Sequence, residues 1–138
     1  MNSLLSNLIQ AYRSPAKARR LFLLDAAGAM VSAFLLGIVL VELEGFFGIP
    51  KSALYVLALI PCFFVLYDLY CFRFVRSNLG LYLKGIAVLN LAYCVLSLGF
   101  AIYHAGEITI FGWVYLVGEI LIVVGLGVLE FLVAGQMD

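Results

Sequence analysis

Long runs of apolar residues, separated by short polar segments, set the pattern of this chain. Four windows of roughly 20 residues are almost free of charged side chains, and that length crosses a hydrocarbon core about 30 Å thick. They lie at approximately 21–43, 53–73, 83–103 and 109–133. We therefore expect an all-α fold in which four transmembrane helices form a bundle, with short loops that make neighbouring helices antiparallel.

The first residues have a different pattern. Leu4, Leu5, Leu8 and Ile9 recur at helical spacing, with Ser and Asn residues on the opposite side. This predicts a short amphipathic helix over about 3–12 that lies in the membrane interface. The four spans leave no room for a second domain, so residues 1–138 are expected to form a single integral membrane domain.

Composition supports the membrane assignment. Of the 138 residues, 66% are hydrophobic and 12% are charged, whereas soluble domains average roughly 45–50% apolar and about 25% charged residues. The formal net charge is zero. We expect the lipid bilayer to surround this chain, and we expect no nucleic-acid partner.

The basic residues predict the orientation in the membrane. They gather before the first span and in the loop between the second and third spans, and one lies elsewhere: Arg13, Lys17, Arg19 and Arg20; Arg73, Arg76 and Lys84; and Lys51. By the positive-inside rule, both termini and the middle loop are cytoplasmic. We expect a multi-pass protein of the plasma membrane, which is the inner membrane if the source is bacterial.

Glu119 lies near the centre of the fourth span. A charged carboxyl at that depth costs about 2.5–3.5 kcal/mol on insertion-derived scales, so such residues usually face protein. Tyr93, Ser97 and Asn90 on the third span have suitable depths to hydrogen-bond to it. Two interpretations remain open: Glu119 handles protons or cations, or it makes a purely structural hydrogen bond between helices.

A second candidate site combines polar residues from all four spans. At 1.5 Å per residue, Asp25, Asp68, Asn90 and Glu130 all lie at a similar level in the cytoplasmic half of the bilayer. One interpretation is a polar vestibule for an ion, a proton or a lipid headgroup. The other is a structural ring that ties the helix ends to nearby basic and tyrosine side chains.

Two further features concern the helices themselves. Pro61, near the middle of the second span, removes the hydrogen bond that the carbonyl of Leu57 would accept, and should kink the helix. Ala29, Ala33 and Gly37 recur at four-residue intervals in the first span. Small residues at this spacing allow close approach of helix backbones.

The chain has few residues of the kinds that support catalysis. Its three cysteines, Cys62, Cys71 and Cys94, form no CxxC pair, and its single histidine excludes paired haem ligands. We expect no catalytic residues, metal or cofactor, and no enzymatic activity. The first hypothesis is a small transport or channel-like membrane protein that works as a homo-oligomer. The alternative is a structural or accessory subunit that meets a partner membrane protein and has no activity of its own.

Overall fold

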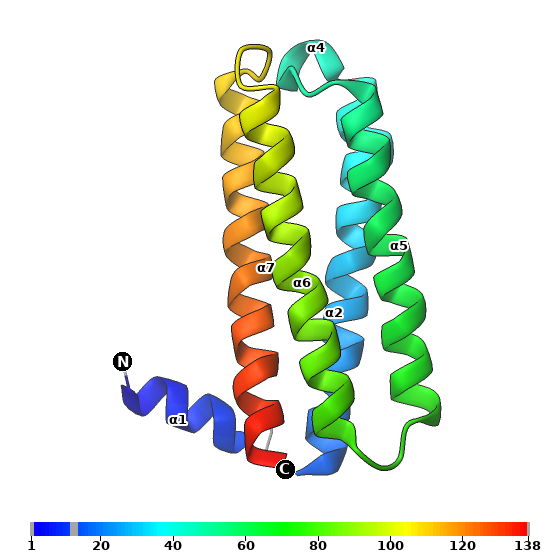
Figure 1. The fold of residues 1–138 in the computed structure, drawn as a ribbon, viewed down its shortest axis with the longest axis vertical. Coiled ribbons are helices and arrows are strands. Elements are labelled where there is room, and N and C mark those ends of the chain that lie inside the picture. The colour runs from blue at the N-terminus through cyan, green and yellow to red at the C-terminus, as the bar shows by residue number, and fades with distance from the viewer. Residues whose placement is uncertain (1, 12–13, 138) are drawn as a thin grey trace.

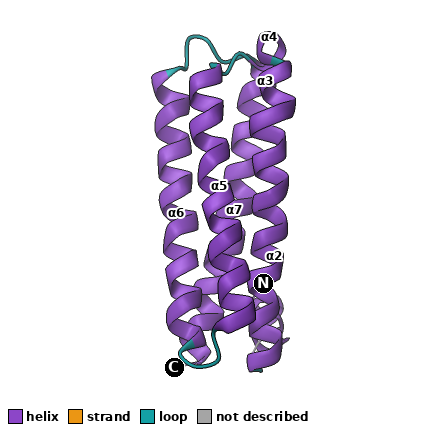
Figure 2. Cartoon of the chain, turned by 90° about the vertical axis from the view of Figure 1, so that its right-hand side faces the viewer, coloured by secondary structure: helices purple, strands orange, loops and turns teal. Residues whose placement is uncertain are grey.

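The computed structural model describes residues 2–11 and 14–137, and these residues are helical apart from short turns, with no strand among them. Four helical segments are long and apolar enough to cross a membrane: Pro15–Glu42, Lys51–Phe74, Leu79–Tyr103 and Ile110–Met137. They run side by side in two views at right angles (Figure 1, Figure 2). The helices thus identify the chain as a small membrane protein.

The elements have these bounds in chain order: α1 (Asn2–Ala11), α2 (Pro15–Phe34), the π-helical turn η1 (Leu35–Val39), α3 (Leu40–Glu42), α4 (Glu44–Phe47), α5 (Lys51–Phe74), α6 (Leu79–Tyr103) and α7 (Ile110–Met137). A helix, α1, covers the part of the predicted range 3–12 that the structure describes, and residue 12 lies outside the described residues. Its position in the membrane interface stays a prediction. The four long segments contain most of each predicted span and extend beyond it by up to six residues at one end.

The start of α2 shows why a helix can extend beyond its apolar window. The hydroxyl of Ser14 accepts a hydrogen bond from the backbone N–H of Lys17 (3.3 Å), and Pro15 occupies the first turn. Both are helix-start signals. The helix therefore begins at Pro15 instead of 21, and the charged side chains of Lys17 and Arg20 lie on its first turns.

A π-helical turn interrupts the first long segment without breaking it. The backbone N–H of Leu40 donates to the carbonyl of Leu35, five residues earlier. Such a turn inserts one extra residue into the helix and rotates the side chains after it relative to those before it. No pattern in the sequence indicated it.

Turns join the long helices at two ends of the molecule. The terminal end carries α1, the last turn of α7 and the α5–α6 connection, and the opposite end, called here the α4 end, carries α4 and the α6–α7 turn (Figure 1). At the α4 end, Thr109 donates its backbone N–H to the carbonyl of Phe47 (3.1 Å) and its hydroxyl to the carbonyl of Phe46 (2.7 Å). These bonds tie the two turns together.

The long helices pack as two pairs. Contact is extensive between α2 and α5 and between α6 and α7, and it is much sparser between the pairs. Gly37 belongs to the first pair, since a Cβ there would lie 3.2 Å from the Cβ of Ala58 on α5. Part of the small-residue stripe of the first span therefore serves packing within the chain.

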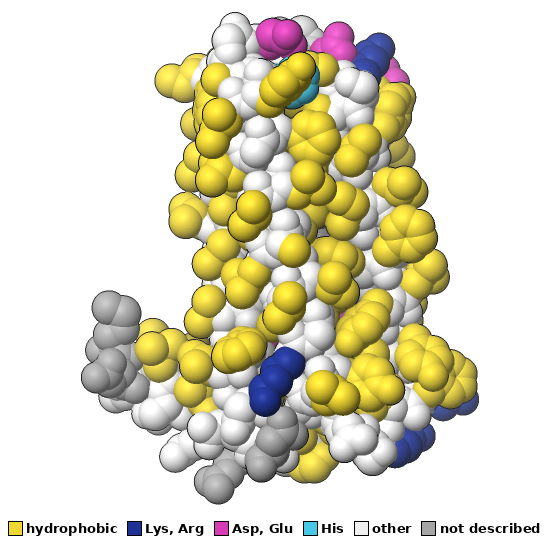
Figure 3. Space-filling model, viewed as in Figure 1, with side chains coloured by type: hydrophobic (Ala, Val, Ile, Leu, Met, Phe, Trp, Pro, Cys, Tyr) yellow, Lys and Arg dark blue, Asp and Glu magenta, His cyan; other side chains and the backbone are white. Residues whose placement is uncertain are grey.

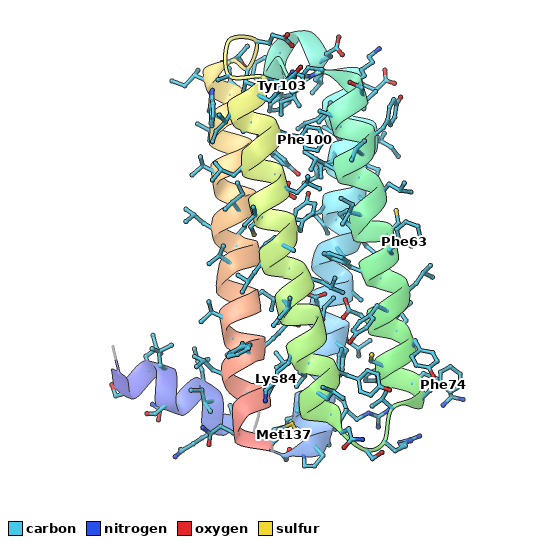
Figure 4. All side chains as sticks on the ribbon, viewed as in Figure 1. Phe63, Phe74, Lys84, Phe100, Tyr103 and Met137 are labelled. Carbon is cyan, nitrogen blue, oxygen red and sulfur yellow. The ribbon has the colours of Figure 1, made fainter. Side chains whose placement is uncertain are left out.

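Apolar side chains cover most of the lateral face seen in Figure 3, while acidic residues and His104 gather at the α4 end. Phe63 and Phe74 point outward from α5 (Figure 4), and both are largely exposed. Lys84 lies toward the terminal end of α6. This distribution is the one expected when lipid surrounds the middle of the molecule and water covers its ends.

Candidate functional site

A cavity of about 660 Å³ lies among the four long helices. Two carboxyl residues, Asp25 on α2 and Glu119 on α7, line it together with the polar side chains of Asn90 and Tyr93 on α6. Most of the remaining lining is apolar. None of the described residues that line it is Lys, Arg or His. The cavity therefore brings two acidic groups into an apolar space without a basic side chain.

The cavity opens sideways between α2 and α7. On α2 its lining includes Leu24 and Val31, and on α7 it includes Val114 and Ile122; all four side chains are exposed on the outside of the molecule. They belong to the membrane-spanning segments. Their exposure means that the opening faces the surrounding lipid and not either end of the molecule.

Glu119 is buried, with 9% of its surface exposed, and is held by Tyr93. The Tyr93 hydroxyl donates to Glu119 Oε1 at 2.6 Å. Glu119 Oε2 has no hydrogen-bond partner among the described residues. Tyr115 lies close to the same carboxyl from α7 itself. Of the three partners considered from depth, the structure selects Tyr93.

Tyr93 also reaches a second acceptor. Its hydroxyl oxygen lies 3.4 Å from the carbonyl oxygen of Leu57 on α5. That carbonyl has no N–H four residues further on, because the residue there is Pro61. The ring of Tyr93 is held beside Phe64 in an edge-to-face contact, with centroids 6.1 Å apart. One phenolic proton thus has two acceptors, one on α5 and one on α7.

Asn90 joins two of the carboxyl groups predicted to share a level. Its amide nitrogen donates to Asp25 Oδ1 at 2.7 Å and to Glu130 Oε1 at 2.9 Å. A side-chain amide has two N–H donors, so both are used. The second oxygens of Asp25 and Glu130 have no partner among the described residues. Three helices, α2, α6 and α7, therefore meet at Asn90.

Asp68 completes this cluster from α5. It is fully buried, neither of its oxygens has a hydrogen-bond partner among the described residues, and it lies close to Asp25 and Glu130. Two carboxyl groups can hydrogen-bond to each other only when one keeps its proton. The carboxyl cluster, meaning Asp25, Asp68, Asn90 and Glu130, is therefore favoured when some of its acids are neutral.

Neighbouring polar side chains make other bonds. The Tyr67 hydroxyl donates to the carbonyl of Tyr82 (2.9 Å), and Arg19 donates to the carbonyl of Phe72 and lies over the Phe72 ring. Arg19 thus bonds to the backbone near the end of α5 and stacks on an aromatic ring. Within the described residues, no group of three or more His, Cys, Asp or Glu side chains is arranged to hold a metal ion.

Ser97 lies apart from both sites. It is buried on α6, its hydroxyl has no partner among the described residues, and it does not line the cavity. The sequence placed it with Glu119 because a depth calculation gives the level of a residue but not the direction of its side chain.

Sequence reasoning missed three contributors to the site: Tyr115, the carbonyl of Leu57 and the sideways opening. Pro61 was the signal for the second, because a proline within a helix always leaves a carbonyl without its usual donor. The opening depends on how two helix pairs meet, which periodicity does not describe.

Comparison with known proteins adds no family or function. No family model, no curated protein and no solved structure matches the chain.

Proposed function

We propose that this chain is a small multi-pass membrane protein with a transport or channel-like function, in which Glu119 takes up and releases a proton or cation. In this proposal the four long helices form an antiparallel bundle across the plasma membrane, and α1 lies in the interface. Both termini are cytoplasmic, because the terminal end carries most of the basic residues. We assign the protein no catalytic step.

The observation that carries the proposal is the single hydroxyl of Tyr93 between two acceptors. When Glu119 is ionised, Tyr93 donates to it and the carbonyl of Leu57 is left without a donor. When Glu119 is protonated, its own O–H can donate to the Tyr93 oxygen, and the Tyr93 proton is released toward Leu57. The proton on Glu119 thus decides whether α6 is bonded to α7 alone or to both α7 and α5.

This exchange links a chemical event to helix packing. A hydrogen bond to a charged group contributes about 1.5–3 kcal/mol, against about 0.5–1.5 kcal/mol for a neutral one. The ionised state therefore has one strong, charge-assisted bond between α6 and α7, and the protonated state has two weaker neutral bonds. The sparse contact between the helix pairs leaves the pairs free to shift. The groups around Glu119 that can titrate are Tyr93 and Cys94 on α6, Tyr115 on α7, and Asp25 across the cavity on α2.

The test is proton flux into liposomes that contain the purified protein and an internal pH-sensitive dye. We expect an imposed pH gradient to collapse faster than in empty liposomes, and Glu119→Gln to abolish the difference. Gln keeps an oxygen that accepts from Tyr93, so the variant should fold. Glu107→Gln, an exposed carboxyl in the α6–α7 turn, is the matched control and should behave like the wild type.

A second variant tests the role of the Leu57 carbonyl. Pro61→Ala restores a backbone N–H opposite it, so Tyr93 no longer has a second acceptor that needs its proton. We expect flux to depend less steeply on pH in this variant. Flux that is the same in the wild type, the Glu119→Gln protein and empty liposomes would overturn the proposal.

Four helices around one cavity that opens sideways do not enclose a complete pathway, so we propose that the protein acts as a homo-oligomer. Chemical cross-linking in native membranes tests this. A ladder of multiples of 15.2 kDa is expected, and a monomer alone at all cross-linker concentrations would contradict it.

The alternative function is a structural or accessory subunit, and the sideways opening is the observation that favours it. Gly28 and Gly118 border the cavity with open space around them, and side chains of a partner helix would fit there. This alternative predicts that Glu119→Gln has no effect on any flux and that a partner membrane protein co-purifies in a fixed ratio.

A further inference from the structure

We propose that the cavity binds a lipophilic organic ammonium ion, which enters sideways from the lipid between α2 and α7 and places its nitrogen against the carboxyl group of Glu119. This inference rests on the proposed function and names the class of molecule that the same site would take. The ligand needs an apolar body and at least one N–H donor.

The charge of the cavity selects a cation. Glu119 Oε2 is a buried acceptor without a hydrogen-bond partner among the described residues, and Glu119 is about nine-tenths buried and lines the cavity. Asp25, which belongs to the carboxyl cluster, adds a second acid to the lining. An unpaired buried acceptor is costly, and a donor from a ligand would remove that cost. A ligand with a carboxylate or phosphate would instead be repelled, since no basic side chain lines the described cavity wall.

The walls of the cavity select an apolar body. Leu35, Phe64, Val123 and Leu126 line it from all sides but α6, and the rings of Phe64 and Tyr93 present aromatic surface, on which an ammonium ion is stabilised. Its volume of about 660 Å³ falls within the range of about 300–1,000 Å³ that is usual for small-molecule sites. An alkyl or aryl ammonium ion matches both the apolar walls and the acidic group of the cavity.

The opening determines the route. Leu24 and Val31 on one side and Val114 and Ile122 on the other are exposed apolar residues of the membrane-spanning segments. A Cβ added at Gly28 or Gly118 would meet nothing within 4 Å, so nothing obstructs the opening at these positions. A ligand reaching the cavity this way must first dissolve in the bilayer, which an ammonium ion with a long apolar tail does.

Binding would be coupled to the proton on Glu119. The balanced exchange is Glu119–COOH plus the ammonium ion giving the Glu119 carboxylate–ammonium pair plus H⁺. The proton leaves as the cation arrives, so no net charge is added to the apolar cavity. Tyr93, Tyr115 and Cys94 contact or face Glu119, and Asp25 lines the cavity from α2, but none of these groups takes part in the exchange.

The test uses three photoreactive probes with the same diazirine-bearing alkyl chain, ending in a primary ammonium, an alcohol or a carboxylate. The full-length protein in lipid nanodiscs is illuminated with each, and the labelled peptides are mapped by mass spectrometry. We expect the ammonium probe to label the cavity-lining residues of α2 and α7, and unlabelled octylammonium to compete for this labelling. The alcohol and the carboxylate should label these peptides much less.

Two kinds of variant test the site itself. Glu119→Gln should weaken competition by octylammonium about tenfold, the usual effect of losing one charge-assisted hydrogen bond. Gly118→Leu fills the cavity, and it should abolish labelling without disturbing the fold, because the position has open space. Gly125→Leu is the matched control on the same helix: it also has open space, but it does not line the cavity.

Each outcome has one meaning. Equal labelling by all three probes, or labelling that survives Gly118→Leu, would show passive occupation by lipid-like chains and overturn the inference. Proton flux that depends on Glu119 without selective ammonium binding would overturn the ligand class and leave the proposed function standing. Selective ammonium binding without Glu119-dependent proton flux would overturn the proposed function and leave the ligand class standing.

Discussion

Glu119 and Glu130 lie on the same helix and are both buried carboxyls bonded to α6, yet their surroundings differ. Glu130 is fully buried in a cluster of polar groups from all four long helices and does not line the cavity. Glu119 lines the cavity beside a sideways opening. Eleven residues separate them, a rise of about 16 Å along the helix.

The contrast indicates that access to the cavity, and not the carboxyl group itself, distinguishes a site that could exchange protons from a structural one. At the carboxyl cluster, both donors of Asn90 are committed to fixed partners. At Glu119, one donor serves two acceptors, and one carboxyl oxygen is buried without a hydrogen-bond partner among the described residues. In the proposed function, the first arrangement ties helices together and the second has two states. Chemical access and stability measurements can test whether the two glutamates differ in this way.

The largest expected effect is on chemical access. A membrane-soluble carbodiimide, dicyclohexylcarbodiimide, should modify Glu119 and leave Glu130 unmodified, because only Glu119 lines a cavity open to lipid. Mass spectrometry of the two peptides measures the ratio, and Glu119→Gln should remove the mass shift of the whole chain. Modification of Glu130 at the same rate would remove the basis of the comparison.

The next largest effect is on stability at the carboxyl cluster. Asn90→Ala removes two hydrogen bonds and leaves two buried oxygens without donors, so the free energy of unfolding should fall by about 3 kcal/mol. Loss of helix signal during denaturation of the protein in mixed micelles measures it. Asn7→Ala, an exposed amide on α1, is the control and should change little. A similarly small effect at Asn90 would show that the cluster is not structural.

Tyr93→Phe should have a smaller effect on stability, about 1 kcal/mol, because it removes one hydroxyl and keeps the ring against Phe64. The same denaturation measurement applies. Tyr103→Phe, at a largely exposed tyrosine, should be neutral. A loss at Tyr93 as large as that at Asn90 would mean that the two sites are equally rigid.

The smallest effect is expected at Asp68. Asp68→Asn should leave the free energy of unfolding within about 0.5 kcal/mol of the wild type, or raise it slightly, because neither carboxyl oxygen accepts a hydrogen bond from the described residues. Glu107→Gln gives the reference for a surface carboxyl. A loss of about 2 kcal/mol or more would show that Asp68 shares a proton that holds the cluster together.

The sequence predicts the helices well because membrane spans have a strong composition signal, and it predicts their ends less well. The span expected at 21–43 belongs to a helix that begins at Pro15, since a capping serine and a proline override the polarity of Lys17 and Arg20. The helix expected at 109–133 continues to Met137. The π-helical turn has no signature in the residue pattern.

The candidate site, like the helices, is predicted only in part by the sequence. Depth along each helix, which comes from counting residues, anticipates that Asp25, Asn90 and Glu130 share a level, and the structure joins them by hydrogen bonds. Direction around each helix depends on the packing of neighbours. For that reason the residue pattern groups Ser97 with Glu119 and does not include Tyr115. The functional roles of all these residues stay predictions.

The bonds that tie the two turns at the α4 end also have a consequence for biosynthesis. Thr109 comes 63 residues after its partner Phe46. At translation rates of about 5–20 residues per second, roughly 3–13 s pass before Thr109 is made after Phe46. The first helix pair must therefore remain in the membrane without these hydrogen bonds during that time. The bonds between Thr109 and the Phe46–Phe47 turn form only after synthesis has reached the last helix.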